Sequence, residues 1–260
     1  MIAWQITIVF ALGLIAGIIN SIAGGGTLLS FPALVLLGVD PIQANVTNTV
    51  ALWPGSLGGM IGFRRELQDS RRWALMLVCP SLAGGLVGAV LLLVTPSSTF
   101  ASIVPYLILF ATLLFAAGER IAKRTGKRLH GGPDSDREAI GAGWWAAAIA
   151  FQFGVAVYGG YFGAGIGILM LAALGLLGLT DIHRMNAVKN LLAGSINAIA
   201  ALYFALEGPV RWRFALIMAA GALVGGYGGA GLARRLGRTL VRRAVVCIGL
   251  AMTLYLLIRR

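Results

Sequence analysis

The chain has 260 residues, of which 58% are hydrophobic and only 12% are charged, and its mean hydropathy is +0.88. A soluble domain carries about twice that fraction of charged residues, so the composition excludes an ordinary soluble protein and favours the lipid bilayer as solvent. The net charge of +12 does not indicate nucleic-acid binding, because almost all of the basic residues lie in short segments between apolar runs and form no basic face.

Ten apolar runs are predicted to form helices, so the expected fold is an all-α, polytopic integral membrane protein. In chain order the runs cover residues 4–22, 27–38, 43–62, 73–95, 101–118, 139–158, 165–179, 183–206, 212–233 and 239–258. Most of them approach the roughly 20 residues that a membrane-spanning helix needs. The second and the seventh are too short, and each follows a glycine-rich break, which is typical of a discontinuous or re-entrant helix.

The two halves of the chain resemble each other in the order and spacing of several residues. The matched pairs are Leu37–Gly38 with Leu177–Gly178, Ile42 with Ile182, Asn45 with Asn186, Thr49 with Asn190, and Gly84, Gly85 and Gly88 with Gly225, Gly226 and Gly229. This order predicts a duplication of about five helical segments per half. We expect a first transmembrane repeat at 1–118, a cytoplasmic basic linker at 119–138 and a second transmembrane repeat at 139–260.

The charge of the turns predicts that the two repeats have inverted topology. The turn at 63–73 and the central linker are rich in arginine and lysine, and so are expected in the cytoplasm, whereas the turn at 95–100 carries no charge. The second-half counterpart of that uncharged turn, at 234–243, carries five arginines and is also expected in the cytoplasm. Equivalent turns on opposite sides require an odd number of crossings per half and place both termini outside.

The two glycine breaks are candidate anion sites. A helix that begins at membrane depth has N–H groups without intrahelical partners and a partial positive charge, and these groups cannot be left in lipid. The alternative is that the glycines serve only close helix packing. The residues expected to bind substrate at the breaks are Asn20, Gly24, Gly25, Gly26, Thr27, Gly163 and Gly165.

Polar side chains at helical spacing follow each break and form a second group of candidates. Amides can donate to an oxyanion without adding negative charge, although such residues also hold membrane helices together. Lys189 is expected inside a span and would supply positive charge, unless it extends to the cytoplasmic surface. The candidate substrate-binding residues are Asn45, Asn48 and Thr49 in the first half, and Asn186, Lys189, Asn190 and Asn197 in the second.

Other chemistry receives little support from the sequence. All nine acidic residues lie in or beside turns, which disfavours a cation or metal site within the membrane and favours an anion. Catalytic motifs of hydrolases or zinc enzymes are absent, so no enzymatic activity is predicted. Cys79 and Cys247 lie singly in apolar runs, and we expect them to be small buried side chains without a disulfide or a metal.

The glycine-rich stretch Ala16–Pro32, the Leu37-Gly38 pair and the helix containing Asn45–Thr49, with their second-half counterparts, resemble the sulfite exporter TauE/SafE family. The resemblance covers nearly the whole chain. It implies a transporter of small sulfur-containing anions, such as sulfite or organosulfonates, in the bacterial cytoplasmic (inner) membrane, without a cofactor. The first repeat has Pro32 where the second has Ala172, so the two short helices are not expected to bend equally.

The expected function is therefore secondary transport, most simply export, of a small anion by alternating access. An anion channel on the same architecture and a membrane scaffold without transport activity remain alternatives. The expected partners are a small anionic substrate and the lipid bilayer, with no nucleic acid. A homodimer is left open, because the glycine faces around Gly84 and Gly225 could serve packing within the chain or between two chains.

Overall fold

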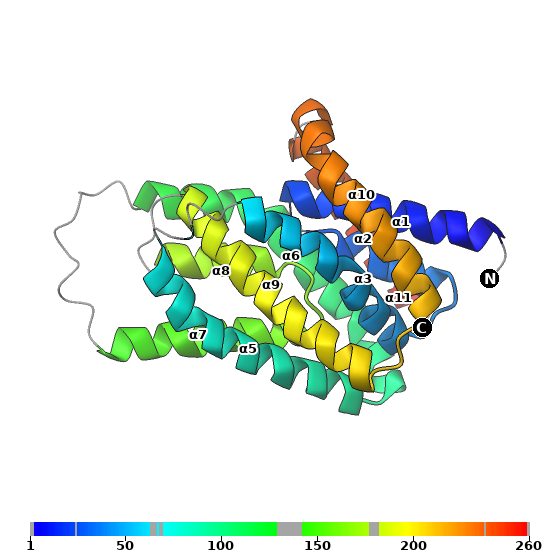
Figure 1. Cartoon of the computed structure of the whole chain (residues 1–260), viewed down its shortest axis with the longest axis horizontal. Helices are drawn as coiled ribbons and strands as arrows, with labels where there is room; N and C mark the ends of the chain where they lie inside the picture. The colour runs from blue at the N-terminus through cyan, green and yellow to red at the C-terminus, as the bar shows by residue number, and fades with distance from the viewer. Residues whose placement is uncertain are drawn as a thin grey trace.

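The computed structural model describes residues 3–23, 25–62, 67, 70–128, 142–176, 182–236 and 238–258. Within these ranges the structure contains ten α-helices and no strand, which confirms the all-helical fold (Figure 1). The helices are α1 (Ala3–Ala23), α2 (Thr27–Leu36), α3 (Pro41–Gly62), α5 (Arg71–Val94), α6 (Ser97–Arg128), α7 (Ala142–Tyr161), α8 (Ile166–Leu176), α9 (Ile182–Glu207), α10 (Trp212–Leu236) and α11 (Arg238–Ile258). Each corresponds to one of the apolar runs.

The two short helices follow the two glycine-rich breaks. α2 has 10 residues and α8 has 11. At 1.5 Å per residue each is about 15 Å long, roughly half of the hydrocarbon thickness of a bilayer. α6 is longer than predicted and continues through Arg128, so the predicted linker begins as helix. The part of α6 beyond residue 118 is composed mostly of residues with high helix propensity. Charged residues such as lysine, arginine and glutamate form helices well in water, so the helix continues beyond the apolar run.

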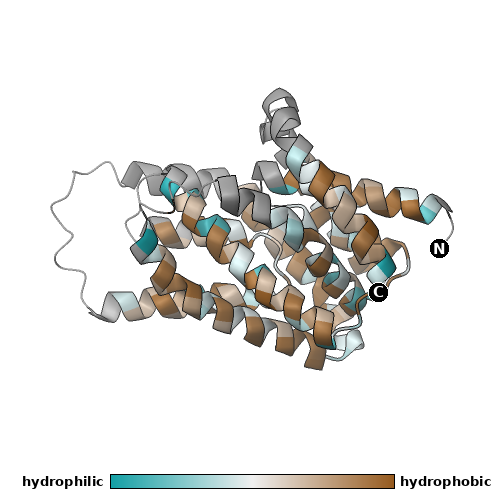
Figure 2. Cartoon of the chain, viewed as in Figure 1, coloured by the Kyte–Doolittle hydropathy of each residue, from teal (hydrophilic) through white to brown (hydrophobic). Residues whose placement is uncertain are grey.

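The helices have the apolar character of a multi-pass membrane protein. In the described part of the chain, three helical segments are long and apolar enough to cross a membrane, namely Trp73–Val94, Ser97–Ala117 and Arg184–Glu207. Four more apolar helical segments are shorter, namely Trp4–Asn20, Thr27–Leu36, Trp212–Tyr227 and Arg243–Ile258. Figure 2 shows hydrophobic residues along most of the helical surface and hydrophilic residues mainly toward the two ends of the molecule.

The two halves exchange helices rather than forming separate bundles. α1 packs along α10, and α7 packs along α5. The first helix of each half therefore contacts the fourth helix of the other half. α3 also packs on α9 and α6 on α11, which pairs equivalent helices of the two halves. If each helix is replaced by its equivalent in the other half, the pair α1–α10 becomes the pair α7–α5, and the pairs α3–α9 and α6–α11 stay the same. This symmetry of packing is what a duplication predicts, while the inverted orientation in a membrane stays a prediction.

Glycines bring these paired backbones into direct contact. A Cβ atom at Gly225 of α10 would lie 2.0 Å from the Leu14 carbonyl oxygen of α1. A Cβ atom at Gly88 of α5 would lie 2.1 Å from the Val157 carbonyl oxygen of α7, and Gly84 approaches the same helix closely. Small residues allow such approach in membrane helices. These glycines therefore serve packing within the chain.

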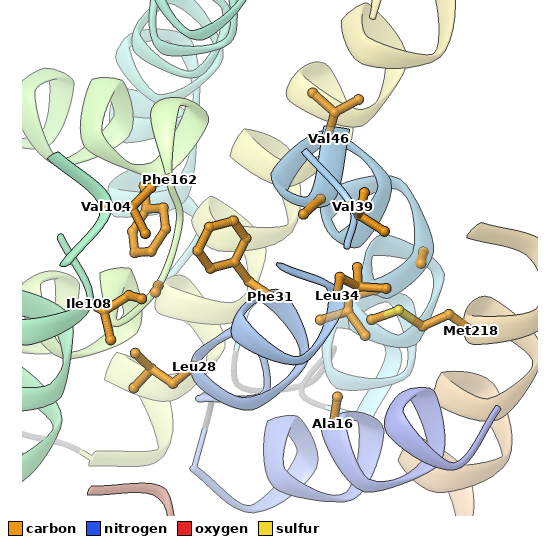
Figure 3. Close-up of a cluster of buried hydrophobic side chains, with 14 of the residues drawn as sticks. Ala16, Leu28, Phe31, Leu34, Val39, Val46, Val104, Ile108, Phe162 and Met218 are labelled. Atoms are coloured by element: carbon orange, nitrogen blue, oxygen red, sulfur yellow. The ribbon is translucent and has the colours of Figure 1, made fainter. Parts of the chain in front are cut away.

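Two clusters of buried side chains fill the interior. The larger one joins both halves: Phe31 of α2 points toward Phe162, with ring centroids 5.3 Å apart and nearly perpendicular planes (Figure 3). Met218 of α10 belongs to the same cluster. The smaller cluster lies between α7, α8 and α9 and includes Leu77 of α5. The larger cluster surrounds the region in which α2 approaches the second break.

The prediction that the two cysteines are buried is wrong. Cys79 on α5 and Cys247 on α11 are free thiols at the surface. Both lie on helices that have one face on the core and another face turned outward, and apolar residues occupy both faces. Hydropathy alone does not separate a core-facing position from a lipid-facing one on such a helix.

We predict that Gly225→Ala destabilises the protein, whereas Gly154→Ala does not. The methyl group at Gly225 forces α1 and α10 apart, and overpacking of this kind costs about 1–3 kcal/mol. Gly154 is also inside a helix, but its Cβ position has open space within 4 Å, and alanine removes a helix penalty of up to about 1 kcal/mol. The thermal midpoint of the purified variants in detergent measures both effects. A Gly225→Ala midpoint at or above that of wild type would contradict this account of the helix pair.

Candidate functional site

The first break is held by a side chain from the preceding helix. α1 ends at Ala23 and α2 begins at Thr27. The Gly26 backbone N–H donates to Asn20 Oδ1 at 2.8 Å, which satisfies one of the N–H groups that lack intrahelical partners. A Cβ atom at Gly26 would lie 2.4 Å from the Ala16 carbonyl oxygen, so a larger residue would displace the start of α2.

A polar cluster connects this break to α3. The Asn48 side-chain nitrogen donates to Thr27 Oγ1 at 3.4 Å, and the Ser30 hydroxyl is hydrogen-bonded to Asn48 Oδ1. The Ser30 hydroxyl also lies 3.0 Å from the Gly26 carbonyl oxygen. Ser30 and Asn48 are buried, so these contacts are shielded from solvent. The predicted candidates Asn20, Gly26, Thr27 and Asn48 therefore lie in one connected cluster.

The second break differs from the first in its backbone conformation and in its hydrogen bonds. Gly163 and Gly165 have φ angles of +78° and +79°, in the left-handed region that favours glycine. The Tyr158 hydroxyl donates to the Ala164 carbonyl oxygen at 2.7 Å, and the Gly163 N–H donates to the Tyr158 carbonyl oxygen at 3.2 Å. Tyr158 therefore fixes the end of α7 and the loop that follows it, by donating one hydrogen bond from its hydroxyl and accepting another at its backbone carbonyl.

α3 forms side-chain hydrogen bonds to both breaks. The Asn45 side-chain nitrogen donates at 2.8 Å to the carbonyl oxygen of Tyr161, the last residue of α7. Asn45 is only 1% exposed and lies one helical turn before Asn48, which binds Thr27 at the first break. One polar face of α3 thus joins two breaks that belong to different halves of the chain.

In the second half, the polar face of α9 runs along α8. Lys189 Nζ donates to Asn186 Oδ1 at 3.2 Å. A Cβ atom at Gly167, in the first turn of α8, would lie 3.4 Å from the Lys189 side chain. A Cβ atom at Gly163 would lie 3.9 Å from Asn197 Oδ1. The polar face of α9 therefore passes the start of α8 at Lys189 and reaches the second break at Asn197.

Among the described residues, the remaining candidates form no side-chain hydrogen bond that joins a break to another helix. The Thr49 hydroxyl donates to the Asn45 carbonyl oxygen within α3 at 2.9 Å, and Asn190 is half-buried on α9. Gly25 lies against the Phe115 ring of α6, and Gly165 lies near Ala111 of the same helix. Gly24 lies outside the described residues.

Sequence reasoning missed several polar residues that hold the site in place. Ser30 and Tyr158 belong to the hydrogen-bonded breaks described above. On another face of α3, Thr47 Oγ1 accepts from the Arg211 N–H at 3.1 Å, and Arg211 Nε donates to Gln43 Oε1 at 2.9 Å. In the sequence, these residues could have been found as single polar side chains within apolar helices, because such side chains usually face the protein interior.

An open pocket of about 470 Å³ lies at one end of the helix bundle, and Thr95 in its lining is 3.4 Å from the hydroxyl of Tyr161, the last residue of α7. It is lined by residues of both halves, including Asp40, Thr95, Ser97, Glu207 and Pro209. Asp40 Oδ1 accepts from the Ile42 N–H at 2.9 Å, which caps the start of α3, and from the Ser97 hydroxyl at 3.2 Å. The pocket therefore opens where the N-terminal end of α3 meets the turns α5–α6 and α9–α10.

Comparison with known proteins identifies related sequences over almost the whole chain. Residues 9–256 match the family described as sulfite exporter TauE/SafE. A probable membrane transporter protein of Haemophilus influenzae is 28% identical over 249 residues, which cover 95% of this chain and 92% of that protein. The probable membrane transporter protein YfcA of Escherichia coli K12 is 28% identical, covering 96% of this chain and 88% of its own length. YunE of Bacillus subtilis, also named a probable membrane transporter protein, is 27% identical over 88% of this chain and 89% of its own length.

No solved structure gives a significant match. The range matched by the family model extends across both glycine breaks and both polar helix faces and includes all of the candidate residues. The relatives are named as membrane transporters, in agreement with the multi-pass helical structure. The chain belongs to the sulfite exporter TauE/SafE family of membrane transporters.

Proposed function

We propose that this protein is a secondary transporter that exports small sulfur-containing oxyanions, such as sulfite or organosulfonates, by alternating access across the bacterial inner membrane. The observation that carries the proposal is the polar face of α3, on which Asn45 contacts one break and Asn48 contacts the other. A ligand bound beside this face would touch both halves of the chain, as a transporter with two moving halves requires.

The chemistry of the site favours an anion. Helix N-termini at the two breaks carry partial positive charge, and amide and hydroxyl side chains can donate hydrogen bonds to an oxyanion. Lys189 adds a cation beside the first turn of α8. Asp40 and Glu207, by contrast, border the pocket at the end of the bundle. A substrate of net negative charge therefore meets its favourable contacts at the breaks.

Alternating access requires contacts that open on one side at a time. We propose that the pocket beside Asp40 is the outer vestibule, and that the hydrogen bonds of Arg211 to Gln43 and Thr47 close the path beneath it in this conformation. These bonds join α3 of the first half to the α9–α10 turn of the second. They would break when the halves rock apart on the outer side.

The proposal is tested by flux through the purified protein in liposomes. We expect saturable movement of sulfite that chloride and acetate inhibit weakly, together with acceleration by unlabelled sulfite on the opposite side. Counterflow distinguishes a carrier from a pore, because a pore gives flux that rises in proportion to the gradient. Folded protein that moves no anion would contradict the proposal, whereas non-saturating flux would assign the same architecture to a channel.

We predict that Lys189→Gln raises the KM for the transported anion by about ten- to a hundredfold, because a hydrogen bond to a charged group contributes about 1.5–3 kcal/mol. Arg184→Gln is the matched control, since it removes a positive charge from an exposed position on the same helix. We expect less than a twofold change for that variant. An unchanged KM in folded Lys189→Gln protein would remove Lys189 from the binding site.

The inverted repeat predicts opposite labelling of equivalent turns. After replacement of Cys79 and Cys247, Ser97→Cys at the start of α6, next to the α5–α6 turn, should react with a membrane-impermeant thiol reagent applied to intact cells. Gly237→Cys, between α10 and α11, should react only after the membrane is opened. Pro209→Cys in the α9–α10 turn serves as a second outer position. Labelling of both Ser97→Cys and Gly237→Cys from outside would contradict the inversion.

A further inference from the structure

Asn45 carries a buried acceptor that the protein leaves unused. Among the described residues, only two buried side-chain atoms have no hydrogen-bond partner, Asn45 Oδ1 and Trp53 Nε1, and both belong to α3. Asn45 is 1% exposed, so bulk water does not reach its oxygen in this conformation. A buried carbonyl oxygen without a donor destabilises the structure, because it has lost its hydrogen bonds to water and gained none from the protein.

The orientation of this amide is fixed by its neighbour. The Asn45 nitrogen donates to the Tyr161 carbonyl oxygen at 2.8 Å. A backbone carbonyl can only accept, so a flipped amide would place two acceptors against each other. The group that remains free at this position is therefore the oxygen, and its partner must be a donor.

The neighbouring polar side chains, unlike the Asn45 oxygen, each have a hydrogen-bond partner. Asn20 Oδ1 accepts from the Gly26 N–H, and Asn48 Oδ1 is bonded to the Ser30 hydroxyl. The Thr49 hydroxyl donates its proton to the Asn45 backbone carbonyl oxygen at 2.9 Å, so that proton is not given to the Asn45 side chain. Among the described residues at the breaks, Asn45 has the only side-chain amide oxygen that is both buried and without a hydrogen-bond partner.

We propose that Asn45 selects singly charged oxyanions that carry a hydrogen-bond donor. The ligand would present an O–H or N–H group to Asn45 Oδ1, while its negatively charged oxygens face the N–H groups at the breaks. This inference rests on the proposed function and narrows its substrate class to protonated oxyanions and to sulfonates with an adjacent hydroxyl or amino group. Anions without a donor leave the buried oxygen unpaired and bind more weakly.

Sulfamate and methanesulfonate provide a matched pair of probes. Both are monoanions with the same number of heavy atoms, but sulfamate has an amino group where methanesulfonate has a methyl group. Each is tested as a competitor of sulfite flux in liposomes at one pH. We expect sulfamate to inhibit at a concentration about tenfold or more below that of methanesulfonate, because only sulfamate satisfies the buried acceptor.

Asn45→Leu should reduce this preference to about one, because it removes the acceptor. Gln152→Leu is the matched control: Gln152 is 2% exposed and donates to Ser81 Oγ at 2.8 Å between α5 and α7, away from the breaks. This variant also loses a buried amide, but it should keep the preference of wild type. The ratio of two inhibition constants is unaffected by the amount of active protein.

The outcomes separate this inference from the function on which it rests. Sulfite flux with equal inhibition by the two probes in wild type would overturn selection by Asn45 and leave the transporter standing. An Asn45→Leu variant that flows and keeps the preference would also overturn it. If Asn45→Leu does not fold, the wild-type ratio decides. Folded wild-type protein without any anion flux or probe binding would overturn both proposals.

Discussion

A helix that begins inside a membrane must find partners for its first N–H groups within the protein, because lipid offers none. This constraint determines what lies next to the two breaks. At the first break Asn20 accepts from the Gly26 N–H, as this constraint requires. At the second break the group that receives a partner is a carbonyl, because the Tyr158 hydroxyl donates to the Ala164 oxygen. Each partner comes from the helix that precedes the break. The positions of α1 and α7 relative to α2 and α8 are thus set by hydrogen bonds as well as by apolar packing.

The same constraint explains why a helix as polar as α3 lies in the interior. Amide side chains are costly in hydrocarbon, so Asn45 and Asn48 are stable only where they have partners, and the breaks provide them. The bond from Asn45 to the Tyr161 carbonyl cannot be given up cheaply, because breaking it would leave that carbonyl oxygen without this donor. The amide nitrogen of Asn45 therefore joins the two halves, and its oxygen is the part of the same side chain that has no protein partner.

The sequence predicted most of the elements but few of their partners. Run length and glycine clusters indicated ten helices and two breaks, and the i, i+3 spacing placed Asn45 and Asn48 on one face. The contact between Asn45 and Tyr161 spans 116 residues and arises because the halves interlock, which no local pattern encodes. Cys79 was assigned to the core because apolar residues face both lipid and protein on α5. Lone polar residues such as Ser30 were the signal that the reasoning overlooked.

A buried acceptor without a partner has a consequence for the transport cycle. In the alternating-access cycle that we propose, the arrangement described here is the closed one; its Asn45 oxygen is buried without a donor, so this arrangement is disfavoured while the site is empty. A ligand that donates to the oxygen removes the penalty, and so binds the closed arrangement more tightly than an open one in which water satisfies the same atom. A ligand shifts a conformational equilibrium only through such a difference in affinity. One amide oxygen on α3 can therefore link recognition of the substrate to closure of the path around it, while an anion without a donor would bind without favouring closure.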